Sequence, residues 1–177
     1  SQLEASMDVS TASMEKYKDV MNEIYAGNYG DNFDDVAGTI SKVTQNMGEM
    51  DPSKLKDISE NAITLRDTFD MDLDESIRGI NGLITNMGTD SQEAFDLVAK
   101  GAQNGLNRSG ELVENLAEYS QLWGHAGFSA KEMFSILQNG LDSGAYNLDK
   151  VNDFVKEFGN SISDGRIEKN LQSFSTG

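Results

Sequence analysis

The strongest constraint on how this chain can fold is a regular recurrence of signals that begin helices. From residue 51 onward, residues favoured at helix N-caps recur at steps of 21, 18, 19, 20 and 18 residues. These starts are Asp51, Asp72, Asp90, Ser109, Ser129 and Asn147. Glycines suited to ending helices lie between them, at Gly30, Gly48, Gly88, Gly105, Gly127, Gly144 and Gly159. The spacing predicts a helix of three to four turns and a short connection, repeated.

The chain also resembles itself at a fixed distance. The stretch DSQEAFDLVAKGAQNG (90–105) aligns with SAKEMFSILQNGLDSG (129–144) at an offset of 39 residues. The offset pairs Glu93 with Glu132, Phe95 with Phe134, Gly101 with Gly140, and Gly105 with Gly144, and continues to Leu112 and Val151. The repeating unit is therefore predicted to be two helices in about 39 residues, the size of helical hairpins that stack into solenoids.

Each predicted helix carries an apolar stripe that a lone hairpin cannot bury, so neighbouring hairpins must stack. One proline among 177 residues favours helices, and alternating β-branched runs typical of strands are absent. The sequence therefore predicts an all-α fold: a right- or left-handed solenoid-like array of helical hairpins with no β-sheet. We expect an N-terminal amphipathic helix within residues 1–30 (Met14–Tyr25), a helical-repeat core over 31–164, and a polar tail or linker over 165–177.

Composition argues against several classes of function. The 30 acidic residues outnumber the 14 lysines and arginines, giving a net charge of −16 that repels nucleic acid. The chain has no cysteine and a single histidine, His125, so thiolate sites and chemistry needing two histidines are ruled out. No apolar run approaches the roughly 18 residues of a membrane span. We predict no catalytic residues, no metal, no cofactor, no direct nucleic-acid binding and no membrane span.

One loop looks at first like a phosphate-binding site. GLNRSGEL (105–112) has the G-x-x-x-x-G spacing of a nucleotide-binding loop, but Glu111 and Leu112 stand where lysine and serine or threonine are needed. We predict structural roles instead. Gly101 and Gly140 let helices pack closely, Gly105 and Gly144 end helices, and Ser109 and Ser129 begin the next ones.

Two further positions have features of binding sites. Asp70-Met-Asp-Leu-Asp74 begins like a calcium loop, but it lacks the glycine and glutamate that the loop requires, and Asp72 fits a helix cap. Trp123 is a possible protein-contact residue, since exposed tryptophan often anchors a partner, although a lone tryptophan also commonly fills the joint between two repeats.

Several segments resemble, in the same order, the core region of bacteriophage tail tape measure proteins. They are AITLRDTFDMDLDESI (62–77), EAFDLVAKGAQNGL (93–106), SGELVENLAEY (109–119), GFSAKEMF (127–134) and NLDKVNDFVKEF (147–158). The resemblance covers roughly residues 31–164. Where the family often has Gly-Asp after the serine, this chain has Gly110-Glu111.

The resemblance implies a fragment of a non-enzymatic structural protein of a long-tailed phage or prophage. Such a protein sets tail length, scaffolds tail tube assembly and contacts tail-assembly chaperones, tail tube and tail tip proteins. It lies in the virion tail interior, and in the bacterial cytoplasm during assembly. The family supplies no catalytic residues for this region. An alternative that uses the same fold is an acidic helical-repeat adaptor that binds a bacterial protein partner.

Overall fold

The described part of the chain, residues 11–144 and 148–163 of a computed structural model, has α-helices as its regular secondary structure and contains no strand. The all-α prediction is therefore confirmed. The helices are α2 (Thr11–Ala26), α3 (Phe33–Met47), α4 (Pro52–Phe69), α5 (Leu73–Met87), α6 (Ser91–Gln103), α7 (Leu112–His125), α8 (Ala130–Asp142) and α9 (Leu148–Ser163).

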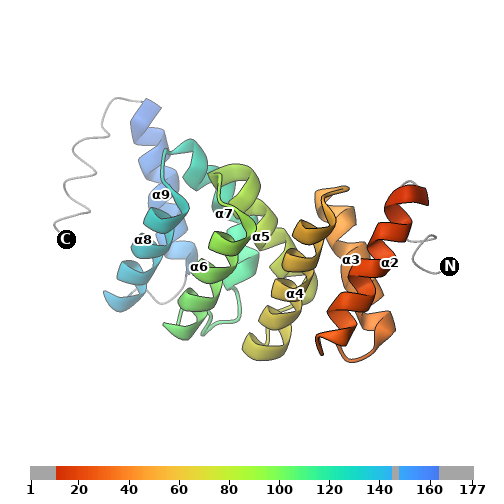
Figure 1. Ribbon diagram of the computed structural model, residues 1–177. Coiled ribbons are helices and arrows are strands. Elements are labelled where there is room, and N and C mark those ends of the chain that lie inside the picture. Colours follow the sequence, from red (N-terminus) through yellow and green to blue (C-terminus); the bar gives the residue numbers. More distant parts are fainter. Residues whose placement is uncertain (1–10, 145–147, 164–177) are drawn as a thin grey trace.

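The helices form two layers because each one packs against the helix two places further along the chain. Helices α2, α4, α6 and α8 make one layer, and α3, α5, α7 and α9 make the other (Figure 1). Helices α2 and α9 lie at opposite ends of the array (Figure 1). This arrangement is the predicted stack of helical hairpins, and it lets each amphipathic stripe be covered by neighbours in both layers.

The predicted period is visible in the helix boundaries. Helices α4, α6 and α8 begin at residues 52, 91 and 130, which are 39 apart, and α5 and α7 begin at 73 and 112, also 39 apart. The last unit departs from this period, because α9 begins 36 residues after α7. Eight residues separate the end of α6 at Gln103 from the start of α7 at Leu112, whereas five separate the end of α8 at Asp142 from the start of α9 at Leu148. Measured from the helix starts, the predicted pairing of Leu112 with Val151 is therefore wrong by three residues.

Three of the six predicted N-caps, Asp72, Asp90 and Ser129, close their helices as expected. The side chains of Asp72 and Asp90 accept hydrogen bonds from the backbone N–H of Glu75 and Glu93. Ser129 forms a complete capping box with Glu132. Asp51 precedes Pro52 as predicted, but its side chain caps no backbone group. Asn147 lies outside the described residues.

Ser109 is not a helix cap, so that prediction is wrong. Helix α7 begins at Leu112 and its N-cap residue is Glu111, whose side chain makes no capping hydrogen bond. The side-chain oxygen of Asn107 accepts from the N–H of Leu112 at 3.2 Å and satisfies a donor that Ser109 was expected to satisfy. The sequence pattern misplaced the start because three residues that favour caps or turns, Asn107, Ser109 and Gly110, lie close together.

The two serines give a matched prediction. Ser129→Ala is expected to lower the free energy of unfolding by about 1 kcal/mol, because it leaves helix N–H groups without an acceptor. Ser109→Ala is expected to change it by less than about 0.5 kcal/mol, because Ser109 is exposed and caps nothing. Urea denaturation followed by circular dichroism measures both. Equal losses for the two variants would contradict this assignment of the caps.

The helix ends confirm the prediction that glycines stop helices, with three exceptions, one of which is Gly30, four residues beyond the end of α2 at Ala26. Gly88 ends α5 in the left-handed conformation (φ 71°), which glycine adopts without a Cβ penalty. Asp70 ends α4 in the same conformation (φ 57°), a role that the glycine pattern missed, although aspartate tolerates it better than most residues. Gly159 was expected to stop a helix, but it lies within α9, which runs to Ser163.

The buried side chains fall into two clusters that meet across α4 and α5. One cluster joins α2, α3 and most of α4, and it includes Ile77 of α5. The other holds Leu65 of α4, Ile80 and Leu83 of α5, and the buried residues of α6 to α9. Within the first cluster, α2 packs against both α3 and α4. The predicted N-terminal amphipathic helix thus shares a core with the array, although Tyr25, expected on its apolar side, is exposed.

A bidentate salt bridge joins the first two hairpins. The carboxylate of Asp35 in α3 accepts from Nη1 and Nη2 of Arg66 in α4, both at 2.8 Å, and both side chains are about four-fifths buried. The hydrogen bonds from Arg66 lower the pKa of Asp35 below its usual value of 3.8, and they outweigh the opposing effect of burial. Because the folded-state pKa is lowered, this pair stabilises the fold above about pH 4 and loses that effect as the pH falls further.

Arg66→Met is therefore expected to lower the free energy of unfolding at pH 7 by about 1–2 kcal/mol. The difference in the free energy of unfolding between this variant and the parent protein should shrink at pH 3. Asp35 begins to be protonated there, so the parent protein also starts to lose the salt bridge. Urea denaturation at both pH values tests this. Arg78→Met is the matched control, because Arg78 is exposed and makes no salt bridge with a described residue. A loss for Arg66→Met that is the same at pH 7 and pH 3 would contradict the role of Asp35.

Candidate functional site

Gly101 and Gly140, at matching positions of the repeat, each lie beneath a side chain. A Cβ on Gly101 would lie 2.9 Å from Cδ1 of Leu106 and 3.2 Å from Cε1 of Phe134 in α8. A Cβ on Gly140 would lie 2.7 Å from Cγ2 of Val151 in α9. Both glycines thus make room for a neighbouring side chain, whereas the closest approach of helix backbones occurs elsewhere.

The loop from residue 104 to 111 is a turn between α6 and α7. Gly105 has a positive φ of 92°, and the nearest atoms to a Cβ there belong to the Arg108 side chain, at 3.1 Å and beyond. Gly144 likewise has a positive φ, 99°, just after α8. The carboxylate-bearing Glu111 stands at the start of α7. The loop therefore makes a helix-to-helix turn, with an acid where a phosphate site needs a base.

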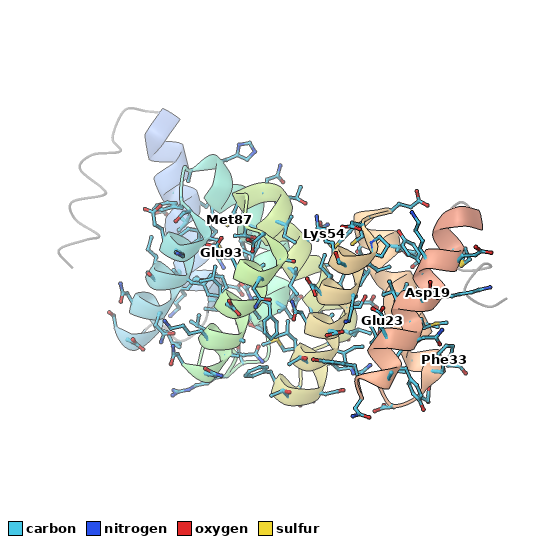
Figure 2. All side chains as sticks on the ribbon, in the orientation of Figure 1. Asp19, Glu23, Phe33, Lys54, Met87 and Glu93 are labelled. Atoms are coloured by element: carbon cyan, nitrogen blue, oxygen red, sulfur yellow. The ribbon has the colours of Figure 1, made fainter. Side chains whose placement is uncertain are left out.

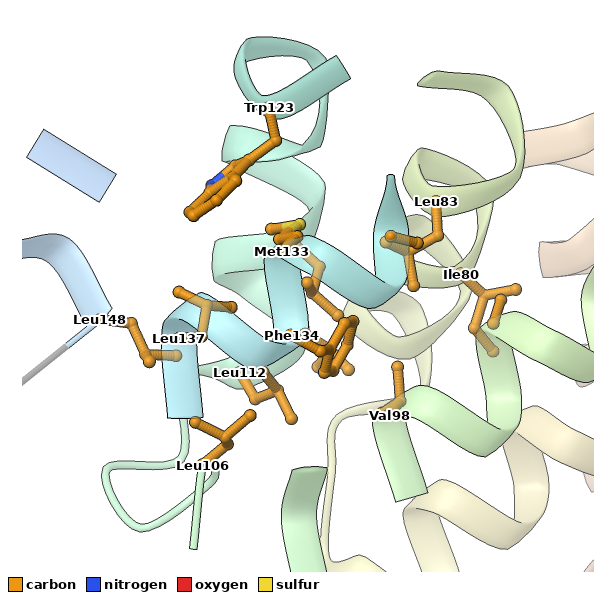
Figure 3. Packing of buried hydrophobic residues seen from close by; sticks show 14 of the residues in the cluster. Ile80, Leu83, Val98, Leu106, Leu112, Trp123, Met133, Phe134, Leu137 and Leu148 are labelled. Atoms are coloured by element: carbon orange, nitrogen blue, oxygen red, sulfur yellow. The ribbon is translucent and has the colours of Figure 1, made fainter. Parts of the chain in front are cut away.

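Trp123 is fully buried, so the prediction that it contacts a partner is wrong (0% exposed). Its indole points into the hydrophobic cluster that also holds Met133 and Leu137 of α8 (Figure 3). It also packs edge-on against Phe128, with ring centroids 5.1 Å apart. The other interpretation, a tryptophan that fills the joint between repeats, describes its position.

Trp123 also begins a buried chain of side-chain hydrogen bonds between α7 and α9. Its Nε1–H donates to Oδ1 of Asn152 at 2.8 Å, and Nδ2 of Asn152 donates to Oδ1 of Asn115 at 2.9 Å. Nδ2 of Asn115 then donates to the carbonyl of Glu111 at 2.9 Å. Both asparagines are at least 95% buried, so each hydrogen bond compensates for a group removed from water.

Helices α5 and α7 meet by a different kind of contact, backbone against backbone. A Cβ on Gly79 would lie 2.9 Å from the carbonyl oxygen of Val113, and one on Gly82 would lie 2.5 Å from Oγ of Ser120 and 3.3 Å from the carbonyl oxygen of Leu116. A Cβ on Gly124 would collide with the carbonyl oxygen of Asn86. We call this contact the α5–α7 joint. No side chain larger than hydrogen fits at these three positions without moving the helices apart.

Sequence reasoning missed both the α5–α7 joint and the hydrogen-bond chain that joins α7 to α9. The α5–α7 joint leaves a weak signal in its two glycines, Gly79 and Gly82, which are three residues apart inside a helical pattern and thus on one face. The α7–α9 chain is signalled by Asn152, a polar residue within an otherwise apolar stripe. Neither pattern shows which helix faces it, because that depends on how the hairpins stack.

The described residues contain no group of three or more acidic, histidine or cysteine residues arranged to hold a metal ion. His125 is exposed at the last position of α7. Asp70 and Asp72 serve as the C-cap of α4 and the N-cap of α5. Among the described helices, none has the length and apolar character to cross a membrane.

Comparison with known proteins gives the array a biological setting. A family model described as phage-related minor tail protein matches residues 23–174. The chain belongs to this family. The match runs from the last turn of α2 through α9, and so includes the α5–α7 joint and the α7–α9 hydrogen-bond chain. The chain is therefore a phage tail protein with a structural role, and it belongs to the virion tail. No match was found among curated proteins or among solved structures.

Proposed function

We propose that this phage tail protein is a segment of a tape measure protein and that it acts without catalysis. Three observations support the proposal: the ordered segments that resemble the tape measure core, the family match over residues 23–174, and the array of stacked hairpins.

The length of the array indicates which role this segment has in a tape measure protein, because the stacked hairpins are much shorter than one continuous helix of the same residues. A continuous helix of 177 residues would span about 265 Å, at 1.5 Å per residue. The four hairpins from α2 to α9, at about 10 Å each, advance only about 40 Å. A segment folded in this way measures little length. We infer that it is a compact module that starts tail assembly by docking to assembly chaperones, tube or tip proteins, while extended helices elsewhere would measure length.

Two changes to the phage that encodes this chain would separate docking from measurement. An in-frame deletion of residues 31–164 is expected to abolish or strongly reduce tail assembly, as seen by electron microscopy. Gly79→Val keeps the chain length but disrupts the α5–α7 joint, and it is expected to reduce assembly as well. Thr85→Val, an exposed change on α5 outside the joint, is the control and should assemble normally.

A model in which this segment measures tail length as an extended helix predicts the opposite results for both changes. If this segment measured length as a helix, deleting 134 residues (31 to 164 inclusive) would shorten tails by about 200 Å, with assembly intact. Gly79→Val would then give tails of normal number and length. Either outcome would overturn the docking role.

A further inference from the structure

In the layer made by α3, α5, α7 and α9, equivalent positions of successive helices face their neighbours in the same way. Lys42, the tenth residue of α3, pairs with Asp74, the second residue of α5, at 3.3 Å. Gly82, the tenth residue of α5, lies against α7, whose second residue, Val113, lies against Gly79. The tenth position of a helix in this layer therefore faces the next helix, and the second position faces the previous one.

By this rule, one side of α3 has no neighbour in its own layer. The second and fifth residues of α3 are Asp34 and Ala37, and they point toward the end of the array, where the described residues supply no earlier helix of this layer. The equivalent fifth residue of α7 is Leu116, which is fully buried against α5. The side of α3 that faces the end of the array thus corresponds to the side of α7 that α5 covers.

This end of the array also exposes apolar surface. The first residue of α7, Leu112, is fully buried, whereas the first residue of α3, Phe33, is 39% exposed. Phe33 packs edge-on against Tyr25, which is 47% exposed, with ring centroids 5.7 Å apart. These two are the exposed large hydrophobic residues of the described chain. Figure 2 shows Phe33 at the α2 and α3 end of the array.

Gly38 adds to this face. It lies exposed within α3, and no atom comes within 4 Å of the position that a Cβ would take. A glycine inside a helix costs about 1 kcal/mol relative to alanine, and nothing in the described fold requires it here. In the α5–α7 joint, glycines are the positions at which a second helix comes closest. We define the α3 end face as Tyr25, Phe33, Ala37 and Gly38.

The charge around the α3 end face indicates what kind of helix fits it. Asp31 and Asp34 are exposed and form no salt bridge with a described residue, while Asp35 is already paired with Arg66. The face is therefore apolar with acidic edges. A second copy of this chain, with its own net charge of −16, would be repelled, whereas a cationic partner would be attracted.

We propose that the α3 end face binds an amphipathic helix of another protein, one with lysine or arginine beside its apolar stripe. The bound helix takes the place that α5 takes on α7, with its stripe against Phe33 and Tyr25 and its backbone close to Gly38. The acidic edges pair with its basic side chains. This proposal concerns a surface and a partner chemistry, and it holds whether or not the chain is a tape measure segment.

The probe for this proposal is a fluorescent peptide of residues 72–88, which is α5 with its caps, carrying Asp72→Ser, Asp74→Ser and Glu75→Lys. These changes make it net positive and put the new lysine on the same helix face as Gly79 and Gly82. The peptide with the natural acids is the charge control. Fluorescence anisotropy with the full chain is expected to show binding of the cationic peptide, at least about tenfold tighter than binding of the acidic one. Phe33→Ser and Gly38→Gln in the full chain are each expected to weaken binding by about tenfold or more. Thr85→Gln, an exposed change on α5, should leave it unchanged.

Three results would overturn the proposal. Equal binding to the parent chain, Phe33→Ser and Gly38→Gln would place the peptide elsewhere on the acidic surface. Binding that appears only after residues 1–10 are deleted would mean that the chain's own N-terminal segment occupies the face. A dimer seen by analytical ultracentrifugation and lost in Phe33→Ser would make a second copy the occupant. Circular dichroism should show that both variants keep the helical content of the parent.

Discussion

Replacing Gly79 by valine is expected to lower the free energy of unfolding by at least about 3 kcal/mol, because the joint has no room for a side chain. The Cβ would lie 2.9 Å from the carbonyl oxygen of Val113 and 3.3 Å from its Cα, and these backbone atoms cannot turn aside as a side chain can. Helices α5 and α7 would have to separate, which would expose Ile80 and Leu83 as well. For a chain of this size, the melting temperature should fall by about 6–12 °C.

The control for this prediction is the same substitution at Gly38. That position also lies inside a helix but has open space around it, so Gly38→Val is expected to change stability by no more than about 0.5 kcal/mol. Thermal and urea denaturation followed by circular dichroism would measure both variants. If they lost the same stability, helix propensity rather than the α5–α7 joint would be the cause.

Trp123→Ala is expected to be the most damaging single truncation at the α7–α9 contact, with a loss of about 4 kcal/mol. The substitution removes a fully buried side chain and leaves a cavity among Met133, Leu137 and Phe128. It also deprives Oδ1 of Asn152 of its donor, in a place that water does not reach. Urea denaturation followed by circular dichroism would measure the loss, since the variant has no tryptophan fluorescence.

Two variants separate the causes of this loss. Trp123→Phe keeps an aromatic ring but removes the indole N–H, so it should cost about 1–3 kcal/mol through the unpaired Asn152. Tyr25→Ala truncates an aromatic residue that is 47% exposed and should cost much less than Trp123→Ala. Similar losses for Trp123→Ala and Tyr25→Ala would contradict the view that the buried joint depends on this tryptophan.

The α5–α7 joint and the α7–α9 contact are chemically different, although they are neighbours in one layer. The α5–α7 joint requires small residues, whereas the α7–α9 contact requires two asparagines and a tryptophan in register. Counted back by 39 residues, Asn115 and Trp123 correspond to Ser76 and Ile84 of α5, which cannot form the same chain. A hairpin docked one place out of order would bury an asparagine without a partner, at a cost of about 1–3 kcal/mol. This difference favours one stacking order among similar repeats.

The helix starts and the repeat period could be predicted because they depend on local signals in the sequence. A cap such as Asp90 or Ser129 acts within three residues of its own backbone, and the period of 39 follows from starts and stops that are fixed locally. The errors arose where several local signals competed. Asn107, Ser109 and Glu111 all lie just before α7, and the bond from Leu112 to Asn107 depends on how the turn closes.

Sequence alone determined the all-α class, most of the helix positions and the 39-residue period from α4 to α8, because each depends on residues near one another in the chain. Only the tertiary structure decided which glycines let backbones meet, that Trp123 is buried and bonded to Asn152, and that no described helix of its layer covers one side of α3. These depend on which helix faces which. A stripe of apolar residues requires burial but does not specify its neighbour, because the hydrophobic effect has no direction.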